Sequence, residues 1–574
     1  MAKTKAITRN GGKATGMAMI AADGLDHAIS FKLCKRLNRF FETLAFLTSL
    51  QKACGRGIQE KAPSDTSEAG ENHSRALECF INKLAQICDN KRGGPTVTSL
   101  AIIRTPDKLL YVFASNQRSE TDAEKPREFV FGLLSYLNRA CATPGFKDDE
   151  SSPVFQHLLR DILKFNYERI GWYRRSLLER LSQCLVDCSR SVSEENDSLK
   201  AVLVTLQQTA LIKANGSDKD DVSDMSSSDE DLVRAATALR QSPVFNAIAD
   251  RGKAGKIDES EHWCELQHFI GRLVSYFKAV QAILRARRRL PELFDTEGLE
   301  IRFLKSSRPI PNPMNVFQAG LPQNQRKTVR SASAIISRMT SDKVKKEKYQ
   351  RYADELQRCD LDGLIARQCC SRTFRPIVHS EVLLLEWLRK EFAEETHSIP
   401  FYDDIKYIGC SKPTCRLCEY YFAAHSSGVR VRPSHRNVYA NWVVPDVLVE
   451  GETSQYKARM IDAVLAKIRD DVFLALREKV SERKRFDSNT CSSLPTYRSV
   501  TGISTNLGGL ASLVEGLSFG SPARTAHYEV AKNVRIEDDA WSAIAQDDES
   551  GDDDDDDDGG GTLVFAGRNT RIQT

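Results

Sequence analysis

The chain has 574 residues, of which 41% are hydrophobic and 28% charged, and its net charge is +4. This length predicts two or three domains of roughly 150 residues each, with ordinary globular composition. We find no apolar run of about 18 residues and no secretory signal, so we expect no membrane-spanning helix. The fifteen cysteines follow no disulfide framework. We therefore expect reduced thiols in an intracellular protein, cytoplasmic or nuclear, with no membrane partner.

The first predicted sheet element is a β-hairpin that follows a helical N-terminal segment, residues 1–72. Residues 74–88 have helical character, and Thr96–Ile103 is rich in β-branched residues. A turn signal at Thr105–Asp107 separates this run from a second one, Leu109–Ala114. Two such runs joined by a short turn predict an antiparallel hairpin.

Residues 117–370 are predicted to be mostly helical. Apolar residues recur there at three- and four-residue spacing, which predicts helices that pack against a core. The clearest segments are 128–139, 154–164, 172–186 and 263–289. Residues 214–232 are acidic and poor in apolar residues, so we expect a disordered linker. A tail from residue 487 to 574, which contains the acidic run Asp547–Asp558, is also predicted to be disordered.

Basic residues cluster in the second half of the predicted helical region. Such clusters fit two interpretations that stay open, contact with nucleic acid or solvated faces of charged helices. The residues are Arg285, Arg287, Arg288, Arg289, Arg326, Lys327, Arg330, Lys343, Lys345, Lys346 and Lys348.

The chemically most informative pattern is His379-Ser-Glu381 followed by Cys415-Arg-Leu-Cys418. One His and two Cys supply three zinc ligands and leave the fourth position open, as in catalytic zinc sites. Zinc lowers the pKa of a bound water to about 7, and a nearby carboxylate such as Glu381 moves protons between water and a departing amine. His-x-Glu followed by Cys-x-x-Cys is the signature of zinc deaminases.

Local structure around these residues is predicted to suit the site. Residues 379–390 and 415–424 have helical character, and 405–410 is a predicted short strand between them. The ligands therefore lie at helix N-termini, where the dipole favours a carboxylate or a thiolate. One departure from the signature is that Thr414 separates Pro413 from the first cysteine. Another long amphipathic helix is predicted over 455–485.

Over residues 376–445 the chain resembles the Orientia-type predicted deaminases, a mainly fungal family of the nucleotide deaminase superfamily. The resemblance rests on His379-Ser-Glu381, on Tyr407–Cys418, on Ser434-His435 and on Tyr439–Pro445. It implies a cytidine-deaminase-like fold, an α/β domain with three layers in the order α/β/α. It also implies a zinc-dependent deaminase activity on a nucleobase, in a nucleotide or in single-stranded nucleic acid.

The element order of that superfamily requires a helix and a hairpin before the His-x-Glu helix. We therefore predict a split domain, with residues 73–116 forming one half and 371–486 the zinc-site half. A large helical insertion, 117–370, separates them. Asn116 then lies where the superfamily often has a substrate-contacting Asn, although it equally fits a turn cap. His435 is a weaker candidate for substrate contact, beside a role in the core or at the surface.

Two other functional classes compete with the enzyme. One is a structural zinc module closed by Cys410 or His425, but that spacing matches no common structural site and leaves Glu381 without a role. The other is a catalytically degenerate deaminase that serves as an interaction protein. The presence of the histidine, the glutamate and both cysteines of the motif argues against this class.

Overall fold

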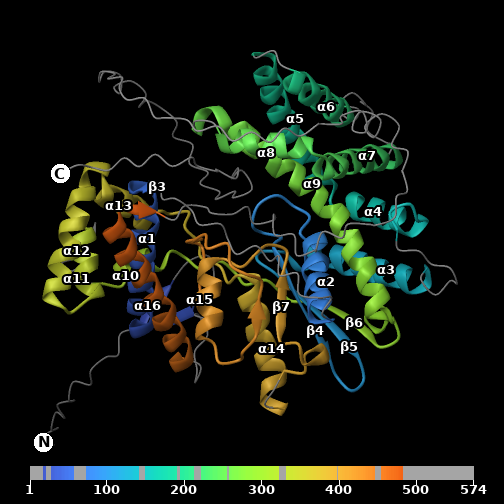
Figure 1. Ribbon diagram of the computed structural model, residues 1–574. Helices are drawn as coiled ribbons and strands as arrows, with labels where there is room; N and C mark the ends of the chain where they lie inside the picture. The colour runs from blue at the N-terminus through green and yellow to red at the C-terminus, as the bar shows by residue number, and fades with distance from the viewer. Residues whose placement is uncertain are drawn as a thin grey trace, which may run out of the picture.

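The computed structural model shows a helix-rich mixed α/β protein (Figure 1). The predicted tail and part of the predicted linker lie outside the residues that the structure describes. The described residues are 17–20, 27–56, 73–140, 149–190, 194–211, 222–254, 257–321, 323, 331–396, 399–445 and 454–481.

A five-stranded sheet with the order β6-β5-β4-β7-β8 forms the centre of the fold. Its strands are β4 (Thr98–Arg104), β5 (Leu109–Ser115), β6 (Leu299–Phe303), β7 (Tyr407–Cys410) and β8 (Arg430–Val431). The predicted hairpin is confirmed, because β4 and β5 pair antiparallel along their whole lengths. The prediction that this hairpin shares a sheet with residues 405–409 is also confirmed, since β4 pairs antiparallel with β7.

The two faces of the sheet bury different sets of helices. Leu100, Ile102, Tyr111 and Phe113 join one hydrophobic core, whereas the alternate side chains of β4 and β5 join another. The first core contains α2 (His73–Cys88), α3 (Glu120–Ala140), α4 (Pro153–Phe165), α5 (Tyr167–Arg190), α6 (Glu194–Leu211), α7 (Val222–Gln241), α8 (Val244–Ala254) and α9 (Ile257–Arg289). In Figure 1, α4–α9 gather at one side of the molecule.

The second core holds the remaining helices. They are α1 (Phe31–Ala53), α10 (Pro313–Ala319), α11 (Ala332–Met339), α12 (Lys343–Glu355), α13 (Leu361–Cys370), α14 (Ser380–Thr396), α15 (Arg416–Ala424) and α16 (Ser454–Glu478). Two small sheets lie apart from the central one, β1 (Met17–Ile20) with β2 (His27–Ser30), and β3 (Gly55–Arg56) with β9 (Val480–Ser481). Helices on both faces of one sheet give three layers.

Close packing of α2 on β7 depends on Gly409. A Cβ atom at this position would lie 2.5 Å from Ile81 Cγ2 and 2.6 Å from Asn82 Oδ1, so a larger residue would push the helix away. The side chain of Asn82 then reaches the strand itself. Its amide donates to the Tyr407 hydroxyl at 2.8 Å, and its oxygen accepts from the Cys410 backbone N–H at 3.2 Å. The glycine thus lets α2 fix the strand that precedes the cysteine pair.

The helical segments expected between the hairpin and residue 370 are present, but β6 was not predicted. Leu299-Glu-Ile-Arg-Phe303 alternates apolar and charged residues after Gly298, which is the two-residue period of a strand. β6 pairs parallel with β5, and Phe303 stacks on Phe113 with ring centroids 4.5 Å apart. The region between the hairpin and the zinc motif therefore adds one edge strand to the central sheet.

The prediction of a disordered linker is wrong for residues 222–232, which belong to α7. Arginines of neighbouring helices neutralise two of the acidic residues there. Asp229 pairs with Arg174 at 2.5 Å, and Glu230 pairs with Arg160 at 2.8 Å. A buried carboxylate that is paired in this way can join a packed helix, which composition alone does not reveal.

Every cysteine in the described part of the chain is a free thiol, and most are buried, as expected. None of the helices described here combines the length and the apolar character that a bilayer-spanning segment needs.

A buried carboxylate ties together the three helices around the cysteine pair. Glu386 of α14 accepts hydrogen bonds from the Tyr421 hydroxyl of α15 at 2.5 Å and from the Tyr456 hydroxyl of α16 at 3.0 Å. His425 and Arg389 lie at 3.4 and 3.1 Å from its oxygens. Burial opposes the charge, but the His425 and Tyr421 hydrogen bonds and the Arg389 charge lower the pKa of Glu386 to about 2.

Glu386→Gln is expected to lower the free energy of unfolding by roughly 2 kcal/mol at pH 7, because it removes hydrogen bonds to a charged group. The pKa of Glu386 lies below its ordinary value, so its charge stabilises the fold above about pH 4.5. This contribution is lost as the pH falls toward 2. Denaturant unfolding at pH 7 and pH 3 measures the difference between variant and wild type, which should shrink at pH 3.

Glu391→Gln on the same helix is the matched control, since Glu391 is exposed and pairs with Arg302 at 3.4 Å. A surface pair of this kind contributes roughly 0–1 kcal/mol. Equal effects of the two substitutions at pH 7 would contradict the role given to Glu386.

Candidate metal centre

Helix α14 begins at the predicted histidine and is capped by a distant residue. The carbonyl of His379 accepts from the Leu383 N–H at 2.9 Å, so His379 holds the N-cap position. Its side chain turns toward the cysteines and caps nothing. Instead, the Asn116 oxygen accepts from the Ser380 N–H at 2.9 Å and satisfies one free donor of the first turn. Asn116 directly follows β5, so the hairpin sets the start of α14.

Helix α15 begins at the cysteine pair. Cys415 is its N-cap residue, and its sulfur accepts from the Cys418 N–H at 3.4 Å. The Arg416 N–H donates to the Asn437 carbonyl at 3.0 Å, which fixes the entry of the chain into the helix. Both ligand-bearing elements therefore present a helix N-terminus, whose positive dipole end favours thiolate and carboxylate charge.

The three predicted ligands come together in one buried group. The ligand atoms of His379, Cys415 and Cys418 all lie within 4.8 Å of one another. His379 Nδ1 is 3.4 Å from the Cys415 sulfur and 3.5 Å from the Cys418 sulfur. Ideal zinc–ligand lengths in a tetrahedral site separate N and S by about 3.6 Å. The cluster is therefore compatible with zinc bound through Nδ1 and two sulfurs.

Glu381 lies beside this group but is not part of it. One of its oxygens is 3.8 Å from the Cys418 sulfur, and only 4% of the residue is exposed. Burial and the negative charge of Cys415 raise the pKa of Glu381 to about 7, against the opposing effect of His379. A carboxyl group with such a pKa both accepts and donates protons near neutral pH.

The two cysteines share one negative charge. Burial opposes thiolate formation at Cys415, but hydrogen bonding from Cys418 and the proximity of His379 hold its pKa well below the ordinary value. Burial and the neighbouring Cys415 thiolate raise the pKa of Cys418 well above it, while the indole N–H of Trp442 acts in the opposite direction. For His379, burial opposes protonation, yet the Cys415 charge raises the pKa. Such a thiol–thiolate–imidazole group is a typical ligand set for a divalent metal.

Asn116 reaches the centre, but both ends of its side chain bond to backbone. Its oxygen bonds the Ser380 N–H, and its Nδ2 donates to the Gly94 carbonyl at 3.0 Å. Only 7% of the residue is exposed. These two hydrogen bonds support the interpretation of Asn116 as a cap, and its contact with a substrate stays a prediction.

His435 also lies close to the centre. Its backbone N–H donates to the Thr414 carbonyl at 3.1 Å, and its Nδ1 accepts from the Asn437 N–H at 3.0 Å. Burial lowers the pKa of His435 to about 4, so its ring is neutral at pH 7. The ring of Tyr439 lies between the two histidines, 5.5 Å from His435 and 6.3 Å from His379.

The residues considered for a closed structural zinc site do not join the group. Among the described residues, the metal-compatible cluster contains neither Cys410 nor His425. His425 ends α15 and lies 3.4 Å from Glu386. Cys410 ends β7, and burial raises the pKa of its thiol to about 12.

Three neighbours of the centre were not predicted from the sequence. The hydroxyl of Ser99 on β4 lies 2.7 Å from that of Ser380 and joins the sheet to the start of α14. Thr414, which takes the place of the signature proline, is fully buried, and its hydroxyl has no hydrogen-bond partner among the described residues. Trp442 is fully buried as well. These serine, threonine and tryptophan residues belong to no spaced motif, so the sequence alone does not distinguish them from ordinary core residues.

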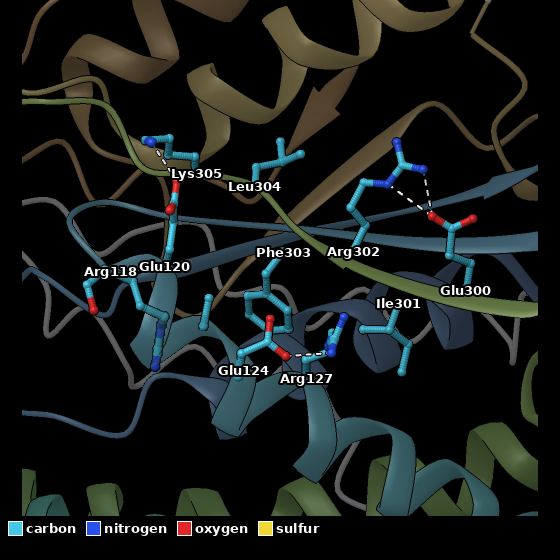
Figure 2. A pocket seen from close by; sticks show the side chains of 12 residues that line it. Arg118, Glu120, Glu124, Arg127, Glu300, Ile301, Arg302, Phe303, Leu304 and Lys305 are labelled. Carbon is cyan, nitrogen blue, oxygen red and sulfur yellow. Dashed lines mark hydrogen bonds and ion pairs between the residues drawn. The ribbon is translucent and has the colours of Figure 1, made fainter.

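A separate cavity of about 340 Å³ lies at the edge of the sheet, between the start of α3 and β6 (Figure 2). Its charged side chains pair with one another. Arg127 bonds Glu124 at 2.5 Å, Arg302 bonds Glu300 at 2.6 Å, and Lys305 bonds Glu120 at 2.5 Å. No residue of the His379 cluster lines this cavity. We therefore do not place the candidate metal centre or its reaction there.

Residues 378–446 match a deaminase family model. The family is described as OTT_1508-like deaminase, and the match spans the histidine, the glutamate, both cysteines and the segment through Trp442. No curated protein and no solved structure matches the chain. The match and the buried His/Cys/Cys group together support an enzyme of the deaminase type with a site compatible with zinc.

Asn116→Ala is expected to weaken zinc binding about tenfold, because it removes the hydrogen bond that holds the Ser380 N–H and so orients the neighbouring His379. It should also lower the free energy of unfolding by roughly 1–3 kcal/mol, since the Ser380 N–H and the Gly94 carbonyl lose their partner. Competition with a chromogenic chelator measures the affinity.

Asn312→Ala provides the control, because Asn312 is a buried residue that also bridges backbone groups. Its side chain accepts from the Met314 N–H at 3.0 Å and donates to the Cys369 carbonyl at 3.0 Å. A similar loss of stability with unchanged zinc affinity is expected. Unchanged zinc affinity in Asn116→Ala would show that the cap does not orient His379.

Proposed function

We propose that this chain is a zinc-dependent hydrolytic deaminase that acts on a nucleobase, in a nucleotide or in single-stranded nucleic acid. The observation that carries the proposal is the convergence of His379, Cys415 and Cys418 with Glu381 beside them. A structural zinc site has no use for a buried carboxylate that lies next to the ligands without joining them.

His379 Nδ1 and the sulfurs of Cys415 and Cys418 would hold the metal. Zinc in such a three-ligand site supplies a Lewis acid and an activated water. The chain itself provides a site with little access to bulk water, since each of these residues is less than 9% exposed. Low exposure strengthens the electrostatic interactions between the site and a developing charge.

Glu381 is the proposed proton carrier. Its position at the first turn of α14 lets the helix dipole favour the carboxylate, while burial favours the neutral acid. The two effects leave a group that accepts a proton at a carboxylate oxygen and then returns it to the ring nitrogen and to the departing ammonia. A carboxyl group that served only as an ion-pair partner would instead have a depressed pKa, as Glu386 has.

We also propose that the deaminase domain consists of residues 73–116 and 371–486, separated by the insertion 117–370. Pairing of β4 with β7 and the hydrogen bond from Ser380 to Asn116 support this division, because both connect the hairpin to the zinc half. Without the hairpin, α14 would lose its cap and β7 would lose one of its two neighbouring strands.

For the substrate, we propose Asn116 and His435 as groups near its binding position. Asn116 hydrogen-bonds the backbone of Ser380, next to His379, and His435 hydrogen-bonds the backbone of Thr414, next to Cys415. If the target base belongs to a polymer, it must be single-stranded or flipped out of a duplex to reach a buried site. Exposed Lys343, Lys345 and Lys348 on α12 then offer contacts to phosphates.

Purified protein is expected to contain about one zinc per chain. Cys415→Ala combined with Cys418→Ala should remove most of it, because thiolates dominate zinc binding. Cys410→Ala is the control for loss of a buried thiol nearby and should keep its zinc. Elemental analysis by mass spectrometry measures the content, and full retention by the double variant would rule out this metal site.

Glu381→Gln is expected to lower turnover about 10²- to 10⁴-fold while zinc content stays unchanged, since it removes the titratable group but keeps the size. The assay measures ammonia release and base change from nucleosides, nucleotides, single-stranded DNA and single-stranded RNA. Glu391→Gln, on the exposed side of the same helix, should retain wild-type turnover. Near-normal turnover by Glu381→Gln would assign this residue a structural role, and a zinc-loaded wild type inactive on all four substrates would favour the degenerate alternative.

A further inference from the structure

Strand β6 forms one edge of the central sheet, and within the described part of the chain β5 is its only neighbouring strand. Just past the end of β6, the Leu304 N–H donates to the Phe113 carbonyl of β5 at 2.7 Å. Since backbone direction alternates along a strand, even-numbered residues of β6 face β5, and the backbone groups of Ile301 and Phe303 point to the outer edge. Such outward groups allow a further strand to pair there.

The cavity of about 340 Å³ between β6 and the start of α3 lies at this edge. Residues 300–305 line it from the strand, and residues of α3 up to Arg127 line it from the helix (Figure 2). Every residue of β6 is half-buried. The apolar ones, Leu299, Ile301 and Phe303, pack against the first core. A strand added at this edge would therefore cover apolar side chains as well as backbone groups.

The order of residues in β6 is self-complementary. In Leu299-Glu-Ile-Arg-Phe303, Ile301 has opposite charges on its two sides and an apolar residue at each end. A two-fold axis at Ile301 would lay a second β6 antiparallel to the first and place Glu300 opposite Arg302 of the second copy, twice. Because the Ile301 backbone points outward, these charged residues would form non-hydrogen-bonded pairs, whose side chains lie closest.

The same two charges disfavour the neighbouring registers. Since the outward backbone groups come from alternate residues, the two strands can slide past each other only in steps of two. One such step places Glu300 opposite its own copy, and the step in the other direction places Arg302 opposite its own copy. Like charges directly opposite destabilise a strand pair, whereas opposite charges stabilise it. The charge order thus favours the register centred on Ile301.

We propose that β6 is a homodimer interface, at which two copies of this chain join their central sheets antiparallel through Leu299–Phe303. Glu300 and Arg302 already lie 2.6 Å apart within the strand, and their side chains are 32% and 37% exposed, so both can take a further partner across the two-fold axis. The inference does not rest on the proposed deaminase activity, because the His379 cluster comes from other elements of the fold.

Sedimentation velocity of the full-length chain over a series of concentrations tests the interface, and the wild type should dimerise reversibly. Arg302→Glu places carboxylates opposite each other across the axis, and Glu300→Arg places guanidinium groups there. Each variant alone should therefore dimerise about tenfold more weakly than wild type. An equimolar mixture of the two variants restores opposite charges at both positions and should form a heterodimer. Local loosening of β6 cannot produce this recovery.

Arg36→Glu is the matched control, because Arg36 of α1 is 34% exposed and pairs with Asp462 at 2.9 Å, away from β6. It should dimerise like wild type. If a charge reversal fails to fold, Glu300→Gln combined with Arg302→Gln removes both cross-axis ion pairs and should weaken the dimer several-fold. The proposal is overturned by a wild type that stays monomeric throughout the series, by a dimer that these substitutions leave intact, or by a mixture that does not recover.

Discussion

The pairing of β4 with β7 is the constraint on which the candidate metal centre depends. Only two residue pairs form this ladder, Ser99 with Cys410 and Leu100 with Gly409. Gly409 permits it by letting α2 approach the strand closely. Once the ladder exists, the end of the hairpin lies beside the start of α14, so Asn116 and Ser99 both reach Ser380. The position of His379 therefore depends on contacts with strands that are distant in sequence.

The centre brings together several groups whose burial is costly, and helix geometry offsets part of that cost. Two helix N-termini, those of α14 and α15, point their positive ends at the same small volume. The thiolate of Cys415 and the carboxyl of Glu381 lie there, at the places where negative charge is best tolerated. Glu386 has four polar neighbours and a depressed pKa, whereas Glu381 has a raised one. One helix thus carries a carboxyl group with a depressed pKa on one turn and a carboxyl group with a raised pKa on another.

The long region between the hairpin and the zinc motif is integrated into the fold. Its strand β6 extends the central sheet, and α9 packs against α2, which in turn holds β7. Buried ion pairs, such as Arg174 with Asp229, join its helices to one another. Since removing one partner of such a pair leaves an unpaired buried charge, these contacts favour a single arrangement of the helices. The region therefore supports the layer of helices behind the strand that leads to the cysteines.

The local features of this protein could be predicted from residue patterns. Each half of the metal motif is local. His379 and Glu381 are two residues apart, Cys415 and Cys418 are three residues apart, and each pair lies at the start of a predicted helix. The hairpin and the long amphipathic helices follow from hydrophobic periodicity, which is equally local. Tertiary structure alone decided which distant groups meet these elements. Asp229 and Glu230 join a helix because Arg174 and Arg160 neutralise them. β6 joins the sheet because β5 offers an edge, and Trp442 forms a bridge with Ile377, two residues before His379. Such contacts depend on the packing of segments that are far apart in the sequence, and no local pattern of residue types predicts that packing.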